Sequence, residues 1–366
     1  MNKPKVILVN LDDNDFIRAY FFQRHLLRTL SEREIDSALF SAMDLRQVFS
    51  NISGPPIMTI LQKELLYKDL QGLHGIPTVF NENKEVLLKR LGHMIRSESP
   101  RALIFNSFEP LLCGFFKDYA RFLSGSRVLI YDPHKLARMQ AASLAAADRT
   151  RFGNITLFTD AHVVEPYYRY GFVPRNIKSV NLVLDEDYFR LLRRLGPMTV
   201  DPCVLFSGGD SARDYGALEK IAQEMETPYV FVSSFYKKLR IDRVGRRSPY
   251  LIYWRYHLQM ANSKIVVISL KKHSHPDSGI TNIVAAHALG KPVIINRTGM
   301  TARYVRHGKN GFLFDDHNEI KRYVARLLND PKLHRRMCAE ARRTFLKHNS
   351  LADLTGRIVK EAGRAG

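Results

Sequence analysis

Short apolar runs with the composition of β-strands alternate along the chain with segments of helical periodicity. These runs are Val6 to Asn10, Ala102 to Asn106, Val128 to Tyr131, Ile155 to Thr159, Lys178 to Val183, Val204 to Ser207, Tyr229 to Val232, Ile265 to Leu270 and Val293 to Asn296. Strands that are separated by helices form parallel sheets built of βαβ units. The pattern therefore predicts an α/β protein with parallel sheets.

The length of the chain and one short segment predict two domains. A chain of 366 residues exceeds a single comfortable core. We expect the junction within Leu192 to Pro202, with a first domain over residues 1–196 and a second over 197–348. Residues 349–366 are expected to form a C-terminal helix that packs back on the first domain. Ligands of open parallel sheets bind beyond the carboxyl ends of the strands, so the residues that follow each strand are the candidate site residues.

Residues 277–295 carry the most informative pattern, a polar turn followed by a short apolar helix and a strand. Ile280, Ile283, Val284, His287 and Ala288 have the spacing of one packed helical face. The amides at a helix start are free to bind, and the helix dipole favours negative charge there. An ordinary helix-to-strand unit would have the same pattern. The candidates for binding a diphosphate are Ser278, Gly279, Ile280 and Thr281.

The segments after this helix follow an order that is typical of one family. They are a strand at 292–296, a loop at 298–300, a turn and short strand at 308–315, and helices at 319–328 and 332–348. The region 203–348 resembles the donor-binding half of GT-B glycosyltransferases, especially family 4. The resemblance implies two Rossmann-like domains facing each other across a cleft. It also implies a nucleotide diphosphate sugar as donor in the second domain, an acceptor in the first, retention of configuration, and no metal or other cofactor.

One position departs from the family pattern. Family members usually carry two glutamates separated by seven residues, and these positions fall on Asp277 and Ala285. The second glutamate typically binds the ribose hydroxyls of the nucleotide, whereas an alanine side chain accepts no hydrogen bond. Either another residue binds the ribose, or the donor differs, or the site is degenerate. Asp277 can still face a sugar hydroxyl.

The turn after Val204 to Ser207 supplies further candidates for donor binding. In the resembling family this turn is glycine-rich and carries basic residues that neutralise the diphosphate. Gly208 and Gly209 allow close approach of the backbone, and Arg213 has a planar donor fork that suits phosphate oxygens. The alternative is a turn in which Asp214 caps the next helix. We place His275 near the donor sugar or phosphate, because two histidines two residues apart in a loop are poor evidence for a metal site.

The acceptor side is predicted from the strand that ends at Tyr131. Asp132 follows this strand directly and His134 comes two residues later. A carboxylate or imidazole at a strand end could remove the proton of an acceptor hydroxyl when its pKa lies near the working pH. A proline-containing turn capped by Asp132 explains the same residues.

Charge and cysteine usage restrict the partners and the compartment. The net charge is +20, with surpluses of +6 in residues 1–196 and +14 in the remainder. The densest basic segment, residues 237–247, lacks the aromatic rings of single-strand nucleic-acid grooves, which argues against nucleic acid. Anionic headgroups at the inner membrane surface, a second phosphate and plain solubility all remain open as explanations of this segment. The three cysteines lie far apart in the sequence and form no CxxC motif, which favours a reducing compartment. No apolar run reaches 18 residues, so we expect a cytoplasmic protein.

These observations favour a metal-independent, hexosyltransferase-like enzyme that moves a sugar from a nucleotide diphosphate sugar to a hydroxyl of a glycan, a lipid-linked or a small-molecule acceptor. A degenerate GT-B protein that binds a glycan or nucleotide without catalysis is the alternative that Ala285 keeps open. A nucleotide-sugar epimerase shares the architecture. A nucleic-acid-binding protein would rest on charge alone.

Overall fold

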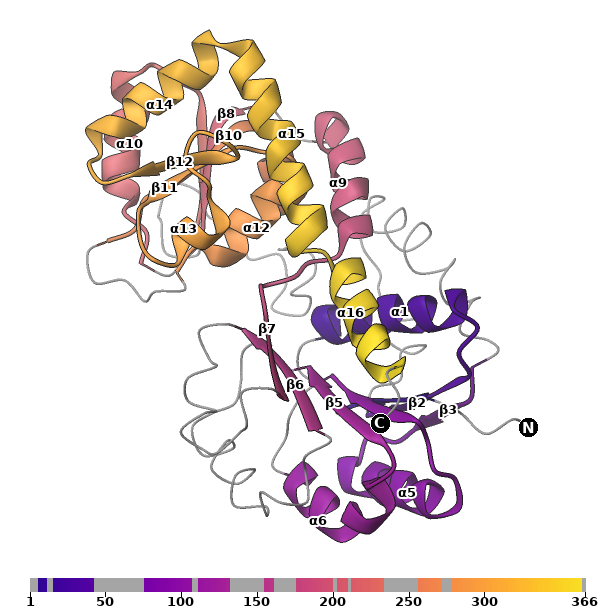
Figure 1. The fold of residues 1–366 in the computed structure, drawn as a ribbon. Helices are drawn as coiled ribbons and strands as arrows, with labels where there is room; N and C mark the ends of the chain where they lie inside the picture. Colours follow the sequence, from indigo (N-terminus) through magenta and orange to yellow (C-terminus); the bar gives the residue numbers. More distant parts are fainter. Residues whose placement is uncertain are drawn as a thin grey trace. The chain divides into compact units, whose positions relative to one another are not determined.

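The computed structural model describes residues 6–11, 16–42, 76–106, 111–131, 155–160, 176–199, 203–209, 212–233, 256–271 and 278–363. The chain forms two compact units (Figure 1). Unit 1 comprises Met1–Asn181 with Leu351–Gly366, and unit 2 comprises Leu182–Ser350.

A seven-stranded parallel sheet forms the centre of unit 1. Its strand order is β3-β2-β1-β4-β5-β6-β7. The strands are β1 (Val6–Asn10), β2 (Ser37–Ser41), β3 (Thr78–Phe80), β4 (Ala102–Phe105), β5 (Arg127–Tyr131), β6 (Ile155–Asp160) and β7 (Ile177–Val180). In the middle of the sheet Val6 aligns with Ser37 of β2 and with Ala102 of β4. All residues of β1 are buried because helices cover both faces.

Helices α5 and α6 cover one face of this sheet, and α1 and α16 cover the other (Figure 1). Their bounds are α1 (Phe16–Glu32), α5 (Lys84–Ser97), α6 (Leu111–Leu123) and α16 (Leu351–Gly363). Phe116 of α6 packs edge-on against Phe105, with ring centroids 5.5 Å apart. The C-terminal α16 packs on α1, and its Glu361 pairs with Arg127 Nη1 at 3.1 Å. The last helix of the chain is therefore part of the first unit.

Unit 2 contains a five-stranded parallel sheet of order β12-β11-β10-β8-β9. Its strands are β8 (Cys203–Gly208), β9 (Tyr229–Val232), β10 (Ser263–Ile268), β11 (Val293–Asn296) and β12 (Gly311–Phe314). Its named helices are α9 (Glu186–Thr199), α10 (Tyr215–Glu224), α12 (Ile280–Ala288), α13 (Thr301–Tyr304), α14 (Asn318–Asn329) and α15 (Pro331–His348). Helices α10 and α14 share one apolar core with the sheet, where Tyr323 stacks on Phe312 at 4.3 Å. Helix α12 packs against α9 and α15.

The predicted parallel α/β architecture is confirmed, and each strand named from the sequence has a counterpart in the structure. Two strands, β2 and β3, were not predicted. β3 has only three residues and follows a proline, so its pattern is too short to stand out. β2 carries serines at both ends, which reduced its apparent apolar run.

The two units divide after Asn181 and after Ser350, whereas the sequence placed the junction within residues 192–202. Helix α9 continues through Gly196 and Pro197 to Thr199. Its buried residues Phe189, Leu192 and Leu195 keep the helical spacing up to that segment, and their packing outweighs the two breaker residues.

The two points at which the chain passes between the units are hydrogen-bonded to each other within unit 2. The amide of Leu184 donates to the carbonyl oxygen of Asn349 at 2.9 Å. The side-chain amide of Asn349 donates to Leu182 O at 2.8 Å. These hydrogen bonds join the first and the last residues of unit 2 to each other, and the chain continues into unit 1 at both points.

Candidate functional site

The candidate donor site lies at the topological switch point of unit 2. From β8 the chain proceeds to β9 on one side and then to β10 on the other. Ligands of open α/β sheets bind beyond the carboxyl ends of the strands at such a point. The predicted residues Gly208 and Gly209 lie there, at the end of β8.

The backbone after β8 is fixed in a shape that requires glycine. Gly209 has a φ of +105°, and a Cβ on Gly208 would collide with the ring of Tyr256. The carbonyl of Gly209 accepts a hydrogen bond from Tyr215 Oη at 2.6 Å, and the same hydroxyl reaches Val232 O at 3.1 Å. Tyr215, which the sequence analysis missed, therefore holds this turn in place.

Arg213 is buried beside the glycine turn. Its Nε donates to Gly208 O at 3.0 Å, and its backbone forms an antiparallel bridge with Leu270 beyond β10. Its Nη2 lies 2.9 Å from the place where a Cβ of Gly209 would be. The guanidinium thus lies next to Gly209, on the side where a side chain would project. Asp214 caps α10 by accepting from the amide of Ala217 at 3.2 Å. The expected cap is therefore present, and it is compatible with an arginine beside the glycine turn.

Helix α12 begins at the same edge of the sheet. Its N-cap, Gly279, has a φ of +90°, and no side chain caps the helix. The first amide to reach Gly279 O is that of Ile283, at 3.0 Å, so the amides before it have no acceptor within the helix. A Cβ on Gly279 would lie 3.3 Å from Ile295 Cδ1 and 3.4 Å from Ile268 Cγ2. The positive φ therefore favours glycine at this position, and a Cβ would fit only tightly.

Asn282 joins the two parts of the site. It lies in the first turn of α12, is 8% exposed, and donates through Nδ2 to Gly208 O at 2.6 Å. The carbonyl of Gly208 therefore accepts from both Asn282 and Arg213. The sequence analysis did not name Asn282. The available signal was an amide side chain in the first turn of an otherwise apolar helix.

The structure brings seven of the predicted donor-site residues to one edge of the unit 2 sheet: Gly208, Gly209, Arg213, Ser278, Gly279, Ile280 and Thr281. Ser278 and Ile280 are buried, whereas Thr281 is exposed. Their role in binding a donor stays a prediction. His275, Asp277, Asp132 and His134 lie outside the described residues. Ala285 is fully buried within α12.

His287 fits the apolar face of α12 because it is uncharged. The side chain is 1% exposed. Burial lowers the pKa of His287 to about 4. At neutral pH the imidazole is therefore neutral, and it packs among apolar residues without carrying a charge into the core.

The sheet of unit 1 has its own switch point, between β1 and β4. Asn106 follows β4 and donates through Nδ2 to Oδ1 of Asn10 at 2.6 Å. Asn10 ends β1 and donates to Ser41 Oγ, at the end of β2, at 3.1 Å. A row of neutral polar groups therefore crosses the carboxyl ends of three adjacent strands. We call these three residues the amide row.

Comparisons with known proteins agree with this fold. Residues 256–344 match the family model of glycosyl transferases group 1. A glycosyltransferase from Rickettsia africae ESF-5 is 12% identical, with 99% of this chain and 98% of that chain covered and a TM-score of 0.61. HepE from Anabaena, solved in complex with UDP, is 12% identical, with 97% and 98% covered and a TM-score of 0.56.

A third solved structure belongs to another class of enzyme. The UDP-GlcNAc 2-epimerase from Neisseria meningitidis, bound to UDP-GlcNAc, is 11% identical, with 97% and 98% covered and a TM-score of 0.54. No curated protein matches the sequence. The family match and the shared fold confirm the resemblance to GT-B glycosyltransferases, while membership of family 4 stays a prediction.

None of the helices in the described part of the chain combines the length and the apolar composition needed to cross a membrane.

Proposed function

We propose that the protein transfers a sugar from a nucleotide diphosphate sugar to a hydroxyl acceptor. The observation that carries this proposal is the convergence of the glycine turn, Arg213 and the start of α12 at the switch point of unit 2. Backbone amides and a guanidinium are the groups that bind phosphate oxygens most effectively. The matched region, residues 256–344, includes α12.

In this proposal the diphosphate is stabilised as it leaves. The bond between the anomeric carbon and the phosphate oxygen breaks, the acceptor oxygen bonds to the anomeric carbon, and the acceptor proton passes to Asp132 or His134. Negative charge develops on the leaving phosphate, where the amides before Ile283 and the Arg213 guanidinium are already oriented. Preorganised donors of this kind lower the barrier because they need no reorganisation during the reaction.

The finer features of the reaction are part of the same proposal. HepE was solved with UDP, which makes UDP-sugars the first donors to test. We infer a retaining, metal-independent hexosyl transfer from the family resemblance. The acceptor would bind unit 1, whose amide row offers neutral partners to hydroxyl groups. The described cysteines Cys203 and Cys338 are free thiols, which supports a reducing, cytoplasmic compartment.

A binding module without catalysis is the second candidate. Ala285 stands where the family has its ribose-binding glutamate, and its buried methyl group offers no acceptor. Such a protein would bind a nucleotide sugar without consuming it. An epimerase would convert the donor sugar without transferring it. Measuring the products formed from UDP-sugars, with and without candidate acceptors, separates the three activities.

The donor site is tested by replacing Gly279 with valine. We expect the affinity for UDP to fall at least a hundredfold in calorimetry, because valine disfavours a φ of +90° and its side chain would crowd Ile295 and Ile268. The matched control is Gly308→Val. Gly308 also has a positive φ, of +76°, but no atom lies within 4 Å of its Cβ position. Unchanged UDP affinity in a folded Gly279→Val variant would contradict the placement of the donor.

A further inference from the structure

A basic pocket lies in unit 2 at the end of α12 opposite to the donor site. Its volume is about 650 Å³. It is lined by Arg193 of α9, by Leu289 and Gly290 after α12, and by Cys338, Ala339, Arg342, Arg343, Leu346 and Lys347 of α15. Helix α12 has nine residues, so roughly 13 Å of helix separates the pocket from the start of α12.

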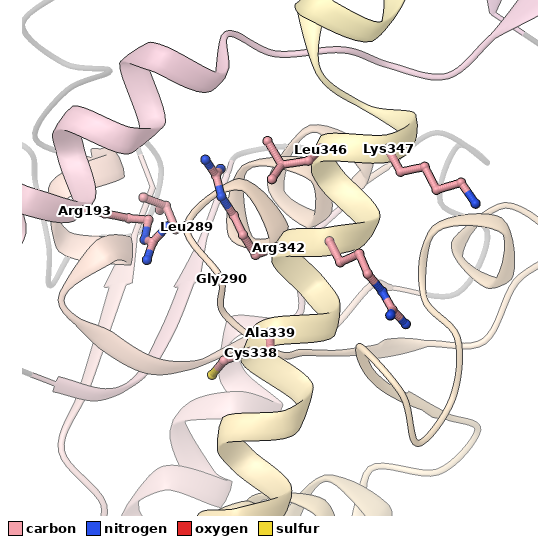
Figure 2. A pocket seen from close by; sticks show the side chains of 9 residues that line it. Arg193, Leu289, Gly290, Cys338, Ala339, Arg342, Leu346 and Lys347 are labelled. Atoms are coloured by element: carbon pink, nitrogen blue, oxygen red, sulfur yellow. The ribbon is translucent and has the colours of Figure 1, made fainter.

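The pocket holds more positive charge than its acidic neighbours balance. Within the described residues, no acid pairs with Arg193 or Lys347 and no hydrogen bond is formed by either side chain. Arg342 donates through Nη1 to Ala288 O at 2.6 Å. Figure 2 shows the side chains of Arg193, from α9, and Arg342, from α15, among the residues that line the pocket. Arg343, the fourth cation of the lining, forms an ion pair with Glu340.

The like charges perturb one another. Burial lowers the pKa of Arg342, and the charges of Arg193 and Arg190 lower it further, with Glu186 opposing them. Burial also lowers the pKa of Lys291, and the charge of Arg193 adds to that effect. The thiol of Cys338 provides no counter-charge, because burial raises its pKa. A bound anion would reduce the repulsion between these cations and offset the cost of burying Arg342.

The carbonyl end of α12 opposes an anion here, since a helix C-terminus carries partial negative charge. Arg342 covers this end through its bond to Ala288 O. The partial charge of a helix end is roughly half a unit. The full positive charges of Arg193, Arg342 and Lys347 exceed it.

Apolar side chains complete the lining. Leu289 is buried under the pocket, and Leu346 is 45% exposed between Arg342 and Lys347. We propose that the pocket binds a phosphate group attached to an organic moiety, at a site separate from the donor site. Guanidinium groups match phosphate geometry. Leu346 would contact the organic moiety.

The first experiment uses Cys338 as a local reporter in the full chain. Inorganic phosphate, compared with chloride at equal ionic strength, should slow the alkylation of Cys338 by iodoacetamide in a saturable way, as measured by peptide mass spectrometry. The variant Arg193→Gln/Lys347→Gln should weaken this protection at least tenfold. The control Lys264→Gln/Lys332→Gln removes the same charge from exposed positions outside the pocket lining and should behave as the parent. No protection in the parent, or equal protection in the pocket variant, would overturn the proposal.

A second experiment identifies the source of the phosphate. Co-sedimentation with phosphatidylglycerol vesicles, and not with phosphatidylcholine vesicles, that weakens at least tenfold in the pocket variant would assign a lipid headgroup. Leu346→Gln should then reduce sedimentation without changing the protection by inorganic phosphate. Protection without sedimentation of the parent would assign a soluble phosphate ester. Sedimentation that is equal in the parent and the pocket variant, together with absent protection, would refute the site.

Discussion

The two sheets of the molecule have switch points of the same topology but opposite chemistry. At the switch point of unit 2, strand β8 ends in glycines, and a buried arginine and a helix start face them. In unit 1 the corresponding position, between β1 and β4, carries the asparagines of the amide row. The topology fixes where a ligand can bind, whereas the residues after the strands decide its charge.

This difference matches the two substrates of the proposed reaction. A diphosphate carries charge and is bound by cations and amides, which unit 2 supplies. A hydroxyl acceptor is neutral and needs partners that donate and accept hydrogen bonds. Within the described residues, no donor reaches Oδ1 of Asn106, which is buried. In the proposed reaction an acceptor hydroxyl would donate a hydrogen bond to this atom.

The comparison is tested most severely by removing the positive charge of Arg213 at the switch point of unit 2. We expect Arg213→Gln to lower turnover by about a hundredfold to a thousandfold, the range typical of losing one preorganised donor to a developing anion. Arg213→Lys should recover part of the loss, because it restores the charge without the planar fork. Steady-state kinetics with saturating acceptor measures both variants. Full turnover of a folded Arg213→Gln protein would remove this residue from the mechanism.

The next prediction concerns the proton acceptor of unit 1. Asp132→Asn should lower turnover by about a hundredfold or more, the usual contribution of a general base. Donor affinity should remain that of the parent, since donor binding is assigned to unit 2. A melting temperature equal to that of the parent is required, because a turn cap at the same position would also reduce activity by misfolding. If turnover is unchanged, His134 becomes the residue to test.

The strand pattern predicted much of the fold. Strands such as β9 and β11 have the bounds expected from their apolar runs. The units divide after Asn181 and Ser350 and not within residues 192–202, because that segment belongs largely to α9, which buried residues such as Leu192 and Leu195 maintain. Local breaker residues are visible in a sequence, but the packing that overrides them is a property of the assembled unit.

The candidate site shows the same limit. The positions of Gly279 and Arg213 at the edge of the sheet were predictable because each comes in the loop after a strand, and their role in binding a donor stays a prediction. Asn282 and Tyr215 were not, because their contribution is a hydrogen bond to a carbonyl of the glycine turn. Such contacts join residues 74 and 6 positions apart in the sequence. The sequence pattern alone does not pair them.

The smallest predicted effect tests the neutral half of the comparison. We expect Asn106→Ala to raise the acceptor KM about fivefold, because the loss of one neutral hydrogen bond costs about 1 kcal/mol. UDP affinity should be unchanged. The matched control is Asn81→Ala, which removes an asparagine after β3 whose Oδ1 accepts from the amide of Asn83 at 2.9 Å. If Asn106→Ala weakened UDP binding and left the acceptor KM unaltered, the amide row would belong to the donor side, and the assignment of charged and neutral substrates to the two sheets would fail.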